Sequence, residues 1–271
     1  MSHGKAHRPS VVRSKGRSAG SAVGLPRRIL VISVGNTSLF GGVFTGDQLT
    51  SFRLPTAELP ALKRQIPDRI DHAVVCSVVP ALTPDVLRFI RRSWNLDAEQ
   101  LTHASPHGLV IGYREPRQLG ADRLAAALGA RALLPRRNVV IVDCGTATTV
   151  TVLRADGRLA GGAILPGLAL WPEMLAQRTA QLPRIVLGAP THATGRSTED
   201  GIASGIFFGH VGAIRELVAR VRVEVFGRSA CIVVGTGGES PRFAGENLFT
   251  VIEPALILQG LHAFALRLDR S

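Results

Sequence analysis

Residues 29–37 read ILVISVGNT, and residues 139–149 read VVIVDCGTATT, so one local pattern occurs twice, 110 residues apart. Each copy is an apolar, β-branched run that breaks into glycine with hydroxyl or amide side chains, and another β run follows at 39–44 and at 150–153. This pattern predicts a β-hairpin whose tight turn exposes backbone N–H groups, which suits a bound anion. Two copies predict two similar lobes that hold one polyphosphate between them.

Bulk composition bounds the class of protein. The chain has 271 residues and 45% apolar residues, enough for one large domain or two of ordinary size. Its longest apolar runs, such as 73–79, have the length of a strand and fall short of a membrane span. No region has the pattern of a signal peptide. We therefore expect a cytoplasmic protein with no membrane partner.

The cysteines and histidines show no metal-ligand spacing. Cys76, Cys144 and Cys231 each lie in or beside an apolar run, which favours buried thiols over a disulfide or a metal site. The histidines considered as ligands, and set aside for surface or packing roles, are His103, His107, His192, His210 and His262.

Positive charge is high but unevenly placed. The net charge is +12 with a pI near 11.2, and much of the excess lies in the first 28 residues. Residues 1–26 lack periodicity and are rich in Ser, Gly and basic residues, which predicts a disordered tail. We favour a solvated basic surface over nucleic-acid binding, because no recognised nucleic-acid motif accompanies the charge. Binding of nucleic acid through the tail stays an alternative.

The order of elements predicts the fold. Three meandering strands, then alternating helix and strand, occur once in residues 27–136 and again in residues 137–271. This order describes an α/β, duplicated ribonuclease-H-like fold of the actin-like ATPase group, with two lobes and a nucleotide cleft between them. The predicted strands are 29–33, 39–44, 48–54, 73–79, 109–111, 139–143, 150–153, 158–165, 231–234 and a short one from 251. The predicted helices are 58–66, 84–95, 120–134, 168–178, 202–223 and a closing helix at the C-terminus.

A Gly-x-Asp-Arg sequence at 120–123 carries the strongest candidate chemistry. Asp122 could accept a proton from a substrate hydroxyl, and Arg123 could clamp a carboxylate or phosphate with its planar fork. The alternative is a helix-capping aspartate beside a surface arginine, which is a common arrangement.

These segments together resemble the type III pantothenate kinase family. The matching motifs cover the chain from about residue 29 to the C-terminus and occur in the family's order. They are SVGNT at 33–37, Tyr113, Pro116 and LGADR at 119–123, DCGTATT at 143–149, SVVP at 77–80, GGAILPG at 161–167, TAQLP at 179–183 and GRST at 195–198.

The resemblance implies ATP-dependent phosphorylation of pantothenate to 4′-phosphopantothenate, the first step of coenzyme A biosynthesis, by a homodimer that uses Mg²⁺ and a monovalent cation (K⁺ or NH₄⁺). It implies that Asp122 is the general base and that Asp143 binds the monovalent cation. The implied pantothenate-binding residues are Tyr113, Gly120, Ala121, Asp122, Arg123 and, reaching the neighbouring subunit, Thr198. The implied ATP-binding residues are Ser33, Val34, Gly35, Asn36, Thr37, Ser38 and Thr146.

One position departs from the family pattern. The family's opening motif starts with Asp, which this chain replaces by Ser33. Serine supplies no charge, so a hard cation would bind more weakly there, although Asp143 occupies the equivalent place in the second copy. The alternative function is therefore a catalytically weak or inactive paralogue that binds ligand or regulates. Two more residues have alternative roles. Trp171 is expected in the core, with the dimer seam or the pocket as alternatives, and Glu239 could contact ribose or be exposed to solvent.

Overall fold

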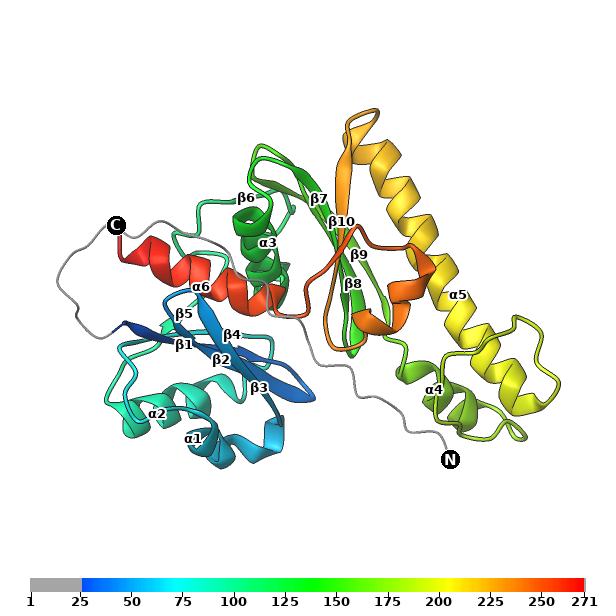
Figure 1. Cartoon of the computed structure of the whole chain (residues 1–271), viewed down its shortest axis with the longest axis horizontal. Coiled ribbons are helices and arrows are strands. Elements are labelled where there is room, and N and C mark those ends of the chain that lie inside the picture. The colour runs from blue at the N-terminus through cyan, green and yellow to red at the C-terminus, as the bar shows by residue number, and fades with distance from the viewer. Residues whose placement is uncertain (1–25, 271) are drawn as a thin grey trace, which may run out of the picture.

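The protein is built from two sheets with the same strand order (Figure 1). In a computed structural model of the chain, residues 26–270 are described, so the expected tail lies outside the described residues except for Pro26. The first sheet has the order β3-β2-β1-β4-β5, and the second has the order β11-β10-β7-β8-β9-β6.

In both sheets a central strand pairs antiparallel with a meander on one side and parallel with later strands on the other. The strands of the first sheet are β1 (Arg28–Val34), β2 (Ser38–Thr45), β3 (Gln48–Pro55), β4 (His72–Ser77) and β5 (Glu99–Gln100). Those of the second are β6 (Val110–Ile111), β7 (Asn138–Cys144), β8 (Ala147–Leu153), β9 (Arg158–Pro166), β10 (Cys231–Thr236) and β11 (Val251–Ile252). The predicted duplicated α/β fold is confirmed in its strand order, and β6 is an addition that pairs parallel with β9.

The hydrophobic core has three layers, because side chains of the central strands alternate between the two faces of each sheet. Successive side chains of a strand point to opposite faces, and both faces of each sheet are covered. Ile29 and Val31 therefore enter a core shared between the two sheets, whereas Leu30 and Ile32 pack on the outer face of the first sheet. On β7, Val139 faces the shared core and Val140 faces the outer core of the second sheet. The unbroken apolar runs of the two copies are explained by this two-sided burial.

The helices cover these faces. The α-helices are α1 (Leu62–Gln65), α2 (Thr83–Trp94), α3 (Ala121–Leu133), α4 (Leu170–Arg178), α5 (Thr198–Val221) and α6 (Leu256–Leu268). Short helical turns are η1 (Thr56–Ala61), η2 (Pro116–Gln118), η3 (Arg222–Phe226) and η4 (Ser240–Glu246). α1 and α2 pack on the first sheet's outer face, and α5 packs on that of the second.

Helices α3 and α6 lie between the sheets and cross at close range (Figure 1). A Cβ at Gly260 would lie 1.7 Å from the Ala125 carbonyl oxygen, and one at Gly129 would lie 2.1 Å from the Leu256 carbonyl oxygen. Such distances are far below van der Waals contact, so glycine is required at both positions. The two helices therefore join the lobes backbone to backbone.

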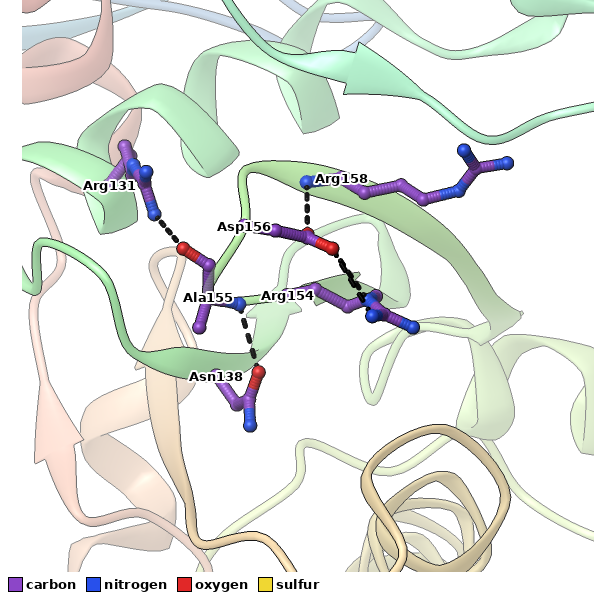
Figure 2. A network of polar contacts seen from close by, with 6 residues as sticks. All are labelled: Arg131, Asn138, Arg154, Ala155, Asp156 and Arg158. Atoms are coloured by element: carbon purple, nitrogen blue, oxygen red, sulfur yellow. Dashed lines mark hydrogen bonds and ion pairs between the residues drawn. The ribbon is translucent and has the colours of Figure 1, made fainter.

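Polar contacts fasten the C-terminal half of α3 to the second sheet at the end remote from the β7–β8 turn (Figure 2). Arg131 donates from Nη1 to the Ala155 carbonyl oxygen at 2.6 Å, and the Asn138 side chain accepts from the Ala155 N–H at 2.9 Å. Asp156 in the same β8–β9 turn accepts from the Arg158 N–H and pairs with Arg154. This network holds the far end of the sheet in register.

Three details differ from the sequence predictions. The single helix expected at 58–66 is divided, because Glu58 has non-helical angles and Pro60 interrupts the ladder, so η1 precedes a one-turn α1. Strand β5 was not predicted, since two exposed polar residues carry no apolar pattern. Helix α5 begins at Thr198 rather than near Ile202, because Ser197 accepts a capping hydrogen bond from the Asp200 N–H.

The run Thr198–Phe226 is long and apolar enough, by length and composition, to cross a membrane. It is the one such run among residues 26–270. Ile206, Phe207 and Val211 of this run are buried in the outer core of the second sheet. We therefore interpret it as a core helix.

Candidate active site

A cleft opens where the two copies of the repeated turn face each other. It has a volume of about 190 Å³ and receives residues from both lobes. Its lining includes Ser33, Gly35, Asn36, Thr37, Ser38, Phe40, Arg53, Val78, Asp122, Asp143, Gly145, Thr146, Ala147, Thr149, Gly237, Gly238, Pro254 and Ile257. Most of the predicted phosphate-contacting residues, from segments far apart in the sequence, therefore meet in one place.

The first turn is held in shape by short-range hydrogen bonds. The Gly35 N–H donates to the Ser38 carbonyl oxygen at 3.0 Å, and the Thr56 hydroxyl donates to the Gly35 carbonyl oxygen at 3.0 Å. Val34 is buried beneath the turn, whereas Asn36 and Thr37 are exposed at its tip. The turn thus presents polar groups to the cleft from a rigid base.

The second turn repeats this construction. The Gly145 N–H donates to the Ala147 carbonyl oxygen at 3.1 Å, and the Gly167 N–H donates to the Thr146 carbonyl oxygen at 3.1 Å. The hydroxyls of Thr37 and Thr146 lie 3.0 Å apart and hydrogen-bond across the cleft. The two turns are therefore in direct contact, and the grip on a polyphosphate stays a prediction.

Asp122 lies in the cleft at the start of α3. Its Oδ1 accepts a hydrogen bond of 2.7 Å from the Arg123 N–H. Burial raises the pKa of the Asp122 carboxyl above its usual range, and that backbone N–H opposes part of the rise. A carboxylate with a raised pKa is a stronger proton acceptor once ionised, which is what a general base requires. Asp122 is not the helix-capping residue, a place taken by Gly120.

Asp143 is the last residue but one of β7 and lines the same cleft. Burial raises the pKa of its carboxyl to about 7, the charge of Asp122 adds to the rise, and Arg53 opposes it. The carboxylate packs against Gly237, where a Cβ would lie 2.3 Å from Oδ1. Gly237 also has a φ of +84°, so this position favours glycine on two grounds. Two carboxyl groups in one cleft, each with a raised pKa, are typical of functional sites.

Arg123 does not line the cleft. Its Nε donates to the Thr151 hydroxyl at 2.9 Å and its Nη2 donates to the Val150 carbonyl oxygen at 2.9 Å. The guanidinium carbon lies 5.6 Å from the centroid of the Tyr113 ring. Arg123 is thus buried beside Tyr113 with much of its donor capacity used by β8. Their expected place in one substrate pocket stays a prediction, and the sequence did not indicate the anchoring of Arg123 to β8.

Ser33 occupies the place that corresponds to Asp143 in the second lobe. It is buried and lies beside Cys76 on the neighbouring strand β4, where the Cys76 thiol interacts with it. Burial raises the pKa of that thiol to about 12. The uncharged serine thus sits in a cleft whose ionisable side chains are Asp122, Asp143 and Arg53. The three cysteines are free, with Cys76 and Cys144 buried as expected and Cys231 half-buried.

Thr198 is not brought to the cleft. It is exposed at the first turn of α5, on the second lobe. Among the described residues, no group of three or more His, Cys, Asp or Glu side chains could hold a metal ion. Any metal bound by Asp143 would therefore not be held by a cluster of three such side chains from residues 26–270.

Arg53 is a cleft residue that the sequence analysis missed. It lies on β3, two strands away from Ser33, and only the strand register brings it to the turn. No motif surrounds it in the sequence, so pairing of β1, β2 and β3 was the one signal that could have found it.

The chain is similar in sequence to one known protein family and to individual proteins of that family. Residues 29–220 match the family described as type III pantothenate kinase. A type III pantothenate kinase of Legionella pneumophila is 34% identical over 88% of this chain and 98% of its own length. One from Elusimicrobium minutum is 35% identical over 90% of this chain and 99% of its own length.

Solved structures share the fold at low sequence identity. A protein of Campylobacter jejuni described as a Baf family transcriptional activator has a TM-score of 0.60 at 19% identity, covering 89% of this chain and all of its own. A sugar kinase homologue of Sinorhizobium meliloti, described as a 2-dehydro-3-deoxygalactonokinase, has a TM-score of 0.55 at 14% identity, covering 89% of this chain and 99% of its own. These likenesses concern the fold alone. The match across residues 29–220, together with relatives at more than 30% identity over nearly their whole length, shows that this chain belongs to the type III pantothenate kinase family.

Proposed function

We propose that this chain transfers the terminal phosphate of ATP to the 4′-hydroxyl of pantothenate, the first step of coenzyme A biosynthesis. Its membership of the family supports this activity. The observation that carries the proposal is the cleft in which two phosphate turns face Asp122. Phosphoryl transfer depends on positioning and on neutralising charge, and a rigid pair of turns serves the first need.

Asp122 is the proposed general base. It accepts the proton of the pantothenate hydroxyl while the oxygen attacks the terminal phosphorus of ATP. Its place in the cleft lining and the raised pKa of its carboxyl support this role. The ionised form is held ready by the Arg123 N–H, whose hydrogen bond fixes one carboxylate oxygen.

Residues of both turns bind the phosphates of ATP in this proposal. Ser33, Val34, Gly35, Asn36, Thr37 and Ser38 form the first turn with the strand end before it, and Thr146 comes from the second. The backbone N–H groups and hydroxyls of such turns favour anions. Gly237 and Gly238 line the same cleft and leave room beside Asp143 for the rest of the nucleotide.

The proposed pantothenate pocket lies beyond Asp122. Gly120, Ala121 and Tyr113 supply its wall, and Arg123 supplies positive charge. Because two donors of Arg123 are occupied by β8, the guanidinium is fixed before substrate arrives. A fixed fork loses little entropy on binding a carboxylate.

Mg²⁺ and a monovalent cation are proposed partners of Asp143. The Asp143 carboxylate fits a cation that arrives bound to ATP, because Mg²⁺ commonly takes one or two protein carboxylates together with substrate phosphates and waters. Mg²⁺ would neutralise charge on the transferring phosphate. Since the pKa of Asp143 is about 7, binding a cation there should release a proton near neutral pH. Calorimetry in buffers of different ionisation enthalpy measures that release directly.

We propose that the chain forms a homodimer through the outer face of α5. Gly201, Gly205 and Gly209 recur every four residues along a groove, and a Cβ at each would meet no atom within 4 Å. The buried Nδ1 of His210 and Nε1 of Trp171 in the same groove have no hydrogen-bond partner within residues 26–270. A second copy could approach closely along the glycines. Thr198, at the start of α5, would then reach the partner's pantothenate.

The dimer has a direct test. Light scattering behind size exclusion should give the mass of two chains for the wild type. Replacing Gly205 by Leu should give one chain with an unchanged circular dichroism spectrum, because the open space at Gly205 is on the outer face. A monomeric wild type would contradict the proposal.

We also propose that the protein is cytoplasmic, without nucleic-acid or membrane partners.

Turnover tests the proposed function. Purified protein with ATP, Mg²⁺, K⁺ and pantothenate should form ADP and 4′-phosphopantothenate in equal amounts. Pantothenate and ATP that bind without turnover, in the wild type and in Ser33→Asp, would instead support a ligand-binding paralogue.

A further inference from the structure

The cleft contains one positive charge whose role no motif assigns. Among the described residues that line it, the ionisable side chains are Asp122, Asp143 and Arg53. Arg53 is therefore the sole cation facing two carboxylates. A site for a polyphosphate needs positive charge, and the carboxyl pair cannot supply it.

Arg53 is held against the first turn by two contacts. Its Nη1 donates to the Ser38 hydroxyl at 2.9 Å, and its guanidinium carbon lies 4.2 Å from the centroid of the Phe40 ring. Stacking on an aromatic face fixes the plane of a guanidinium and leaves its edge available for hydrogen bonds. Of the five N–H donors of arginine, one is used by Ser38.

The strand register explains why the charge sits here. Ser33, Phe40 and Arg53 form one cross-strand row of the first sheet, and Asp143, Thr149 and Ile164 form the corresponding row of the second. The second lobe has its charge on the central strand as a carboxylate. The first lobe has a neutral serine there and a cation two strands away.

We infer that Arg53 binds the β- and γ-phosphates of ATP directly and gives the first lobe the positive charge that Ser33 cannot recruit through a metal ion. The inference deepens the proposed function and rests on ATP being the ligand of the cleft. Charge-assisted contacts of this kind fix phosphate geometry and strengthen as negative charge shifts in phosphoryl transfer.

The test is nucleotide binding, measured by calorimetry on full-length Arg53→Gln, Arg53→Lys and the matched control Arg158→Gln. Arg158 is the first residue of β9, at the end of the sheet remote from the β7–β8 turn, and belongs to the network of Figure 2. Arg53→Gln should weaken ATP binding by about tenfold or more, with and without Mg²⁺. AMP binding should change less than about twofold, because AMP lacks the β- and γ-phosphates. Arg53→Lys should recover part of the loss, and Arg158→Gln should behave like wild type.

Equal losses of ATP and AMP, or no loss, would overturn the inference, and so would failure of lysine to recover any binding. A second measurement separates it from the proposed function. If wild type binds ATP and phosphorylates pantothenate while Arg53→Gln binds ATP normally, only the role of Arg53 fails. If wild type binds no ATP, both fail.

Discussion

The two lobes share a strand order but differ in the chemistry at the end of each central strand. Ser33 is the last residue but one of β1, before its turn, and Asp143 is the last residue but one of β7, before the corresponding turn. Asp143 is a carboxyl with a pKa near 7 facing Gly237, whereas Ser33 is a buried hydroxyl facing Cys76. The fold has been kept in both copies while the charged groups have been divided between them. Four experiments would break or sharpen this comparison.

The largest effect on kcat is expected at Asp122, which belongs to neither turn. Asp122→Asn should lower kcat by about a hundredfold to ten-thousandfold, because the proton acceptor is lost. ATP affinity, measured by calorimetry, should stay within about threefold, since asparagine keeps the shape of the side chain. An active Asp122→Asn enzyme would assign the base elsewhere.

Asp143→Asn should cost about a hundredfold in kcat, by the loss of one charged contact beside the transferring phosphate. The free energy of unfolding near neutral pH should rise with the same substitution, in contrast to the fall in kcat. The folded pKa of about 7 lies above the unfolded value near 4, so ionisation favours the unfolded state, and wild-type stability should fall as pH rises from about 4 to 7. Without ligands, urea unfolding of Asp143→Asn should show a weaker fall in that window. Parallel pH profiles would mean that Asp143 titrates normally.

Ser33→Asp makes the first lobe resemble the second. We expect about a tenfold gain in the Mg²⁺-dependent rate, because the new carboxylate can hold the cation beside the phosphate. The ligand-free protein should lose stability, since the carboxylate would be buried next to the Cys76 thiol. Ser33→Ala serves as the control and should show no gain. A rate unchanged by aspartate would show that the first lobe does without a metal-binding carboxylate.

The smallest effect concerns the bridge between the turns. Thr37→Val and Thr146→Val each remove one partner of the 3.0 Å contact. A double-mutant cycle on ligand-free stability should give a coupling of about 0.5 kcal/mol, because the pair is solvent-exposed. A coupling of zero would mean that the lobes are not fastened at this point in solution.

Much of this architecture could be predicted because the deciding signals are local. Apolar β-branched runs broken by glycine indicate hairpins wherever they occur, so both turns and the duplication were visible in residues 29–37 and 139–149. The Ser197 cap of α5 was also present in the sequence and was overlooked. The boundary between lobes at residues 136 and 137 stays a prediction.

What escaped prediction depends on pairing between distant residues. Arg53 reaches the cleft only through the register of three strands, and a lone arginine on a strand has no distinguishing neighbours. The anchoring of Arg123 also escaped prediction, because its partners on β8 lie 27 and 28 residues further along the chain. The proposed dimer face of α5 is equally nonlocal, because it depends on what the rest of the chain leaves uncovered.

The crossing of α3 and α6 limits how the enzyme can move. With Gly129 and Gly260 bringing the helices into backbone contact, neither can slide along the other without collision. Rotation about that contact remains available, so we expect the lobes to open and close by rotating about the crossing of α3 and α6. Such a rotation would separate Thr37 and Thr146, whose hydroxyls are 3.0 Å apart in this structure. Nucleotide entry and ADP departure would then depend on this helix crossing, and Gly260→Ala, which places a Cβ 1.7 Å from the Ala125 carbonyl oxygen, would hinder the rotation.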